Sequence, residues 1–143
     1  MGGFTNSTEA RVLDHFTGKT AYTVPTWYVG VSTTTPTEGG ASFTEPSAGA
    51  YARKEITAAT WTAATGGDPS STSYGAQITF NQATGGWGTL THMGLFSVLT
   101  LGTGLVHFWG TLTNPKAIQT SDSASFAANT FFVKLGDPPD TYT

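Results

Sequence analysis

The chain lacks several features that would define its chemistry. No cysteine occurs among its 143 residues, which excludes disulfides, thiolate catalysis and zinc sites built on cysteine. Charged residues make up only 10% of the sequence, whereas an ordinary soluble domain has about 25%. Thr, Ser, Gly and Asn must therefore cover much of the surface. This composition is typical of all-β proteins that work outside cells or inside assemblies.

Basic residues are too few and too scattered to suggest a nucleic-acid partner. The net charge is −3, and the basic residues are Arg11, Lys19, Arg53, Lys54, Lys116 and Lys134. Nucleic-acid binding requires clustered Lys and Arg that displace counterions, so we expect none. No stretch approaches the roughly 18 apolar residues of a membrane helix, and MGGFTNSTEA does not resemble a secretion signal. We therefore expect no membrane partner and synthesis in the cytoplasm.

The periodicity of apolar residues predicts one short helix followed by strands. Val12, Leu13 and Phe16 fall at helical spacing over about residues 8–17, where Asn6 and Glu9 have the spacing of a capping box. Alternation predicts strands at 27–32, 50–57 and 75–81, a central strand within GGWGTLTHMGLFSV (85–98), a hairpin partner at 105–113, and last strands in KAIQT and 126–136. Segments 32–50 and 65–75 are predicted loops.

These elements predict an all-β fold. We expect a single-domain β-sandwich or barrel (jelly-roll-like) with a short N-terminal helix over residues 1–136. In 27–32 the alternation predicts one buried face, and in the central strand it places Leu90 and His92 on the same face. The tail GDPPDTYT has two prolines and no core residue, so 137–143 is predicted to be a flexible arm.

No residue pattern predicts catalysis or metal binding. His92 and His107 lie on strands joined by a short turn and could be cross-strand neighbours, but no acidic residue between Asp68 and Asp122 offers a third ligand. We predict that both are half-buried framework residues bonded to hydroxyls or carbonyls. No G-x-S-x-G elbow, phosphate loop or calcium loop occurs, and the acidic residues lie mostly in loops. We therefore expect no enzyme, catalytic residue, cofactor or metal.

Aromatic residues are the remaining candidates for ligand binding. Trp87 stands among glycines at a turn, so it is the best candidate for an exposed ring that could stack on a sugar, with Tyr51 as a second. The alternative, which we favour, is that these rings belong to the core, because large aromatics dominate burial in small β domains.

Several motifs occur in an order that resembles a known family. They are RVLDHF, YTVPTWYVGVSTTTPT, EPSAGAYARKEIT, GAQITF, GGWGTLTHMGLF and GLVHFWGTLTNPKAIQTSDSASFAA. Together they resemble small virion structural proteins of tailed bacteriophages, described as tail fibre, minor tail or capsid decoration (cement) proteins. The resemblance spans about residues 5–135 and implies a non-enzymatic virion protein without a cofactor.

The resemblance leaves two roles open. The first is a decoration protein on the capsid surface, which binds the major capsid protein and stabilises the head. We expect a homotrimer, because a closed cyclic assembly would compensate for the missing disulfides. The alternative is a tail or tail-fibre component that binds host-surface glycans. From their position near the chain ends, the residues predicted to make intermolecular contacts are Phe4, Pro138, Pro139 and Tyr142.

Overall fold

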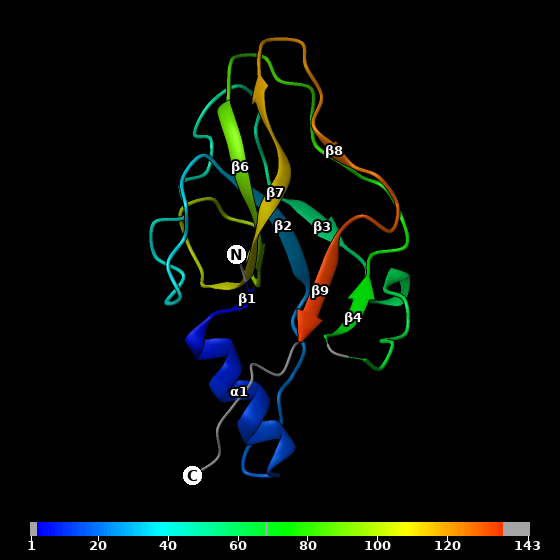
Figure 1. Ribbon diagram of the computed structural model, residues 1–143. Coiled ribbons are helices and arrows are strands. Elements are labelled where there is room, and N and C mark those ends of the chain that lie inside the picture. Colours follow the sequence, from blue (N-terminus) through cyan, green and yellow to red (C-terminus); the bar gives the residue numbers. More distant parts are fainter. Residues whose placement is uncertain (1–2, 68, 136–143) are drawn as a thin grey trace.

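Residues 3–67 and 69–135 are described by the structure, a computed structural model. This part of the chain contains one α-helix, one short 3-10 helix and nine strands (Figure 1). The helices are α1 (Asn6–Phe16) and η1 (Ala58–Thr60). The strands are β1 (Gly3–Phe4), β2 (Trp27–Ser32), β3 (Lys54–Ile56), β4 (Ser70–Ser73), β5 (Ile78–Thr79), β6 (Gly88–Phe96), β7 (Val106–Ile118), β8 (Ser125–Phe126) and β9 (Phe132–Leu135). The all-β class with one short N-terminal helix is confirmed. The predicted arm, 137–143, lies outside the described residues.

One large sheet organises the molecule. Its five strands are antiparallel neighbours in the order β1-β7-β6-β2-β3. The prediction that 85–98 contains a central strand paired with 105–113 is therefore confirmed. Two smaller ladders, β4-β9 and β5-β8, contribute the other strands.

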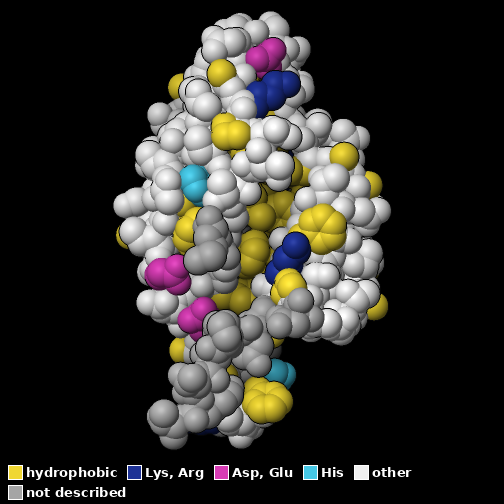
Figure 2. Space-filling model, viewed as in Figure 1, with side chains coloured by type: hydrophobic (Ala, Val, Ile, Leu, Met, Phe, Trp, Pro, Cys, Tyr) yellow, Lys and Arg dark blue, Asp and Glu magenta, His cyan; other side chains and the backbone are white. Residues whose placement is uncertain are grey.

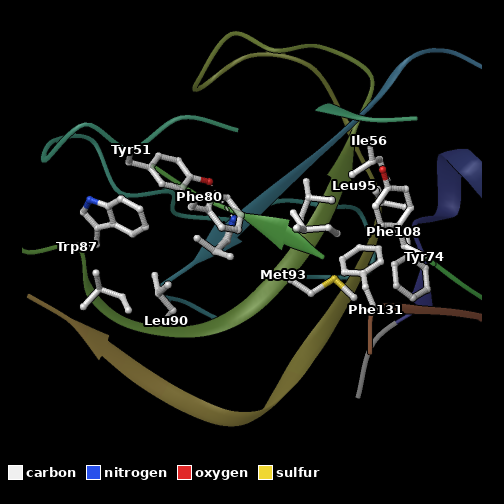
Figure 3. Close-up of a cluster of buried hydrophobic side chains, with 14 of the residues drawn as sticks. Tyr51, Ile56, Tyr74, Phe80, Trp87, Leu90, Met93, Leu95, Phe108 and Phe131 are labelled. Carbon is white, nitrogen blue, oxygen red and sulfur yellow. Dashed lines mark hydrogen bonds between the residues drawn. The ribbon is translucent and has the colours of Figure 1, made fainter. Parts of the chain in front are cut away.

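The main core lies between the large sheet and the two ladders. Residues of the sheet, such as Val31, Leu95 and Phe108, share one buried cluster with Tyr74, Phe80 and Phe131 from the other side. Figure 3 shows these side chains converging over β6 and β7.

The opposite face of the large sheet is also buried, which corrects the prediction of one buried face for 27–32. Phe96, Val106 and Trp109 form a second cluster, on which Tyr28 and Phe43 pack. Phe43 belongs to the predicted loop 32–50. Because this loop folds over the sheet, β2 is buried on both faces from Val29 to Ser32.

A bulge in the sheet corrects the predicted faces of the central strand. Leu90 pairs with Lys116, but His92 already pairs with Thr111, so the register shifts at Thr91. A bulge interrupts the alternation of side chains. Leu90 therefore joins the main core and does not share a face with His92.

Three further boundaries differ from the prediction. The helix begins at Asn6 and its N-cap is Thr5, whose hydroxyl donates to the Val106 carbonyl at 2.8 Å, so the expected capping box is not formed. The predicted loop 65–75 contains β4, which is polar and forms because β9 pairs with it. The first residues of KAIQT continue β7 and are not a separate strand.

Candidate functional site

His107 connects the helix to the sheet. Its side chain is 2% exposed. Nδ1 lies 3.1 Å from Oγ1 of Thr8 in α1, and Nε2 lies 3.1 Å from Oγ of Ser97. Burial, and secondarily the charge of Arg11, lower the pKa of His107. A neutral imidazole between two hydroxyls is a framework contact, as predicted.

His92 has similar surroundings, but it is not a neighbour of His107. Its Nδ1 lies 2.8 Å from Oγ1 of Thr91, and its cross-strand partner is Thr111. Burial lowers the pKa of His92 as well. The expected pairing of the two histidines is therefore wrong, because the hairpin register places Thr111 opposite His92, and His107 falls at the register shift between Leu95 and Phe96. Within 3–67 and 69–135, no group of three or more His, Cys, Asp or Glu could hold a metal ion.

The motif EPSAGAYAR folds into a buried polar network around an ion pair. Arg53 donates to both carboxylate oxygens of Glu45, with Nε–Oε1 at 2.9 Å and Nη2–Oε2 at 2.6 Å. The two side chains are 1% and 8% exposed, respectively. The Tyr51 hydroxyl donates to Glu45 Oε1 at 2.9 Å and accepts the N–H of Val31 at 2.9 Å. Burial and the Glu45 charge raise the pKa of Tyr51, so the phenol stays protonated as a donor.

The same network ties three segments of the chain together. Arg53 Nη1 donates to the carbonyls of Val98 at 2.8 Å and Thr103 at 3.1 Å, both in the β6–β7 turn. The guanidinium also lies 3.5 Å from the centre of the Phe96 ring. A Cβ on Gly30 would meet Glu45 Oε1 at 2.7 Å, so the glycine of YVG leaves room for the carboxylate. The network anchors the loop 32–50, and its polar groups are occupied by one another.

The aromatic rings considered for sugar stacking belong to the core. Trp87 is 4% exposed and Tyr51 is 7% exposed. The indole N–H of Trp87 donates to the Gly49 carbonyl at 2.8 Å. The favoured alternative of core packing therefore holds for both residues.

Two residues of the apolar stripe of α1, Leu13 and Phe16, face solvent, whereas Val12 is half-buried. Leu13 is 62% exposed and Phe16 is 86% exposed, and Val24, in the segment between α1 and β2, is 60% exposed. Figure 1 shows α1 projecting from the end of the β domain. We call Leu13, Phe16 and Val24 the α1-end surface.

A cavity of about 300 Å³ lies beside α1, with Thr8 and Val12 of the helix in its lining. Its lining comes from α1, the segment that follows α1, the residue after η1, and several strands, and includes Phe4, Val12, Tyr22, Trp27, Trp61 and Val133. The Tyr22 hydroxyl is buried and interacts with the Arg11 side chain. Burial raises the pKa of Tyr22. The cavity is therefore mainly apolar, with one phenol in its lining.

The predicted contact residues lie partly beside this cavity and partly beyond the described residues. Phe4 pairs with Phe108 in the large sheet, and the two rings meet edge to face at 5.5 Å. Phe4 is thus half-buried in its own chain, and its intermolecular role stays a prediction. Pro138, Pro139 and Tyr142 lie outside the described residues.

Comparison with known proteins identifies the family. The model of one family, described as podophage GP4 fiber I protein gp80, matches residues 3–134. The chain belongs to this fibre-protein family. It is a structural protein of a tailed-phage virion, which confirms the resemblance found in the sequence. No curated protein matches the chain.

Among the described residues, no helix is long and apolar enough to cross a membrane.

The network around Arg53 and Glu45 was not predicted from the sequence. The feature that could have indicated it is the spacing of Tyr51 and Arg53, which lie two positions apart and therefore on one face of an extended chain. An acidic residue, Glu45, comes shortly before them.

Proposed function

We propose that this chain is a fibre subunit of the virion and that its copies associate through the α1-end surface. The family description favours the fibre role. The observation that carries the association is an apolar helix stripe, with Leu13 and Phe16 largely exposed, on a helix that projects from a folded domain. Exposed apolar clusters of this kind mark interaction sites.

The homotrimer is the assembly that we propose. Fully burying a Leu or Phe side chain stabilises an assembly by about 1.5–3 kcal/mol. In a cyclic trimer every subunit contributes the same residues, so three copies of Leu13, Phe16 and Val24 would be removed from water at once. The cavity beside α1 offers space for a side chain from a neighbouring subunit.

Replacing Leu13 and Phe16 together by serine should weaken self-association at least tenfold, because the variant removes the largest exposed apolar groups of the surface. Sedimentation velocity over a concentration series would measure this. The fold should be unchanged, since both side chains are already exposed.

The matched control is Leu99→Ser. Leu99 is 54% exposed and lies in the β6–β7 turn, outside the α1-end surface, so its loss should leave assembly unchanged. A wild-type chain that stays monomeric at high micromolar concentration would contradict the proposed trimer.

Capsid decoration is the second candidate function. It is favoured by the polar, charge-poor surface and by the loop 32–50, which the Glu45–Arg53 pair holds in one conformation on the outside of the sheet. In this role the protein would lie on the capsid surface, and the α1-end surface or this loop would contact the major capsid protein.

Location in the virion distinguishes the two roles. We would label intact virions with gold-conjugated antibody to this protein and measure its copy number by quantitative mass spectrometry. Gold confined to the tail region, at a copy number similar to that of tail proteins, is expected for a fibre subunit. Gold spread over the head, at a copy number near that of the major capsid protein, would overturn the fibre role and support decoration.

A further inference from the structure

A second cavity, of about 380 Å³, opens between β7 and the segment around β8. Its floor is made of core side chains, among them Leu90, Met93 and Phe131. Figure 2 shows hydrophobic side chains at the bottom of a hollow in this region of the surface. We call this cavity the β7–β8 cleft. Its volume lies at the lower end of the roughly 300–1,000 Å³ usual for sites of small ligands.

The rim of the cleft is polar and carries one cation. It consists of the side chains of Thr113, Asn114, Lys116, Ser123 and Ser125. All five are exposed, and none of these side chains forms a hydrogen bond or ion pair with another described residue. Thr and Ser residues near ladder β4-β9 differ in their hydrogen bonding, because Thr62, Thr72 and Ser73 bond one another and the backbone. The rim groups are thus available to a ligand.

An aromatic ring stands between floor and rim. Phe126 lines the cleft and is half-buried. Its orientation is fixed by edge-to-face contacts with Phe80 at 6.3 Å and Phe131 at 5.6 Å between ring centres. A fixed ring beside unpaired hydroxyl and amide groups offers one apolar surface and several hydrogen bonds to the same ligand.

We infer that the β7–β8 cleft binds a saccharide unit that carries a carboxylate. A sugar ring has an apolar C–H face, which suits the floor and Phe126, and a hydroxyl periphery, which suits the Ser, Thr and Asn side chains. Lys116 is the charged residue of the lining, and no acidic residue lines the cleft. A charge-assisted hydrogen bond from Lys116 would therefore favour an acidic sugar over a neutral one.

The backbone beside the cleft disfavours an extended peptide as the ligand. A peptide that adds to a sheet edge needs a regular row of N–H and C=O groups. Here Pro115 lacks an N–H, and the register shift of the hairpin falls between Thr111 and Lys116 of β7. The edge is irregular at the position where such a strand would pair.

The biological setting of this binding rests on the fibre role proposed above, because a fibre subunit can meet the host surface. The binding itself can be tested apart from that role. The experiment uses the purified full-length chain on an array of glycans that contain uronic or sialic acids, together with neutral glycans of matched linkage. We expect binding to carboxylated glycans at least tenfold above their neutral counterparts.

Variants then locate the site. Lys116→Gln should lower the affinity for the best carboxylated glycan about tenfold, the loss expected for one hydrogen bond to a charged group. Ser125→Trp, which fills the cleft, should abolish binding. Lys134→Gln removes an exposed lysine that does not line the cleft and should bind as wild type. Thermal unfolding of each variant checks that the fold is kept.

Each outcome decides the inference. Equal binding of acidic and neutral glycans, no binding to any glycan, or the same loss with Lys134→Gln as with Lys116→Gln would overturn it. These results are independent of where gold labels the virion. Tail labelling without glycan binding would overturn only the proposed glycan binding in the cleft. Head labelling with glycan binding would overturn only the fibre role.

Discussion

Arg53→Met is expected to lower the free energy of unfolding by about 3–5 kcal/mol, the cost of breaking a buried ion pair on one side. The variant leaves the carboxylate of Glu45 in a site that is 8% exposed, without its cation. It also leaves the carbonyls of Val98 and Thr103 without the donors that hold the β6–β7 turn. Urea denaturation monitored by tryptophan fluorescence would measure the loss.

The adjacent residue provides the control for this prediction. Lys54 is also a cation, but its ammonium group bonds the Asn81 side chain at the surface, at 2.7 Å. Lys54→Met should therefore change stability by no more than about 0.5 kcal/mol. The double variant Glu45→Gln/Arg53→Met should be more stable than Arg53→Met alone, because no buried charge remains. If Arg53→Met and Lys54→Met cost the same, the burial of the pair does not determine stability.

Elements with a strong apolar period could be predicted from the sequence. The alternation of Val29 and Val31 predicted β2, and the apolar residues of GGWGTLTHMGLFSV predicted the central strand, whose Met93 and Leu95 face the main core. The helix was likewise visible from Val12, Leu13 and Phe16. Periodicity reports which side chains share a face, but it did not show that the opposite face of the sheet is buried as well.

Elements that depend on a distant partner could not be predicted. The strand β4 has the sequence SSTS and no apolar alternation, and it exists because β9 supplies its hydrogen bonds. The loop 32–50 has no period either, yet Thr33 and Thr44 bond across it and Ser32 Oγ accepts the Thr44 N–H at 2.9 Å. Such contacts join residues far apart in sequence, so local patterns do not contain them.

The α1-end surface and the β7–β8 cleft could not be predicted from the sequence for a related reason. The pattern of α1 showed an apolar stripe, but it could not show that part of the stripe faces solvent, since that depends on where Thr5 and His107 fix the start of the helix. Similarly, the rim of the β7–β8 cleft combines β7 with the chain around β8. In the sequence, these polar rim residues look the same as the many other Ser and Thr residues of the chain.

Two adjacent phenylalanines, Phe131 and Phe132, differ in burial, and replacing the buried one is expected to cause the second large loss of stability. Phe131 is 2% exposed, and its ring contacts Trp61 and Phe126 edge to face. Phe131→Ala is expected to destabilise the fold by about 3–5 kcal/mol, because it removes a buried ring and leaves a cavity. The measurement is again urea denaturation, analysed for an unchanged m value.

Phe132→Ala is the matched control, because it makes the same chemical change one residue away. Phe132 is 42% exposed, and its ring faces solvent with the Lys134 ammonium group 5.7 Å from its centre. Its loss should cost no more than about 0.5 kcal/mol. Equal effects of the two substitutions would mean that β9 does not pack on the core in the register that pairs Phe132 with Ser73. Because Phe131 also forms the floor of the β7–β8 cleft, the same comparison tests whether the cleft has the base on which ligand binding would depend.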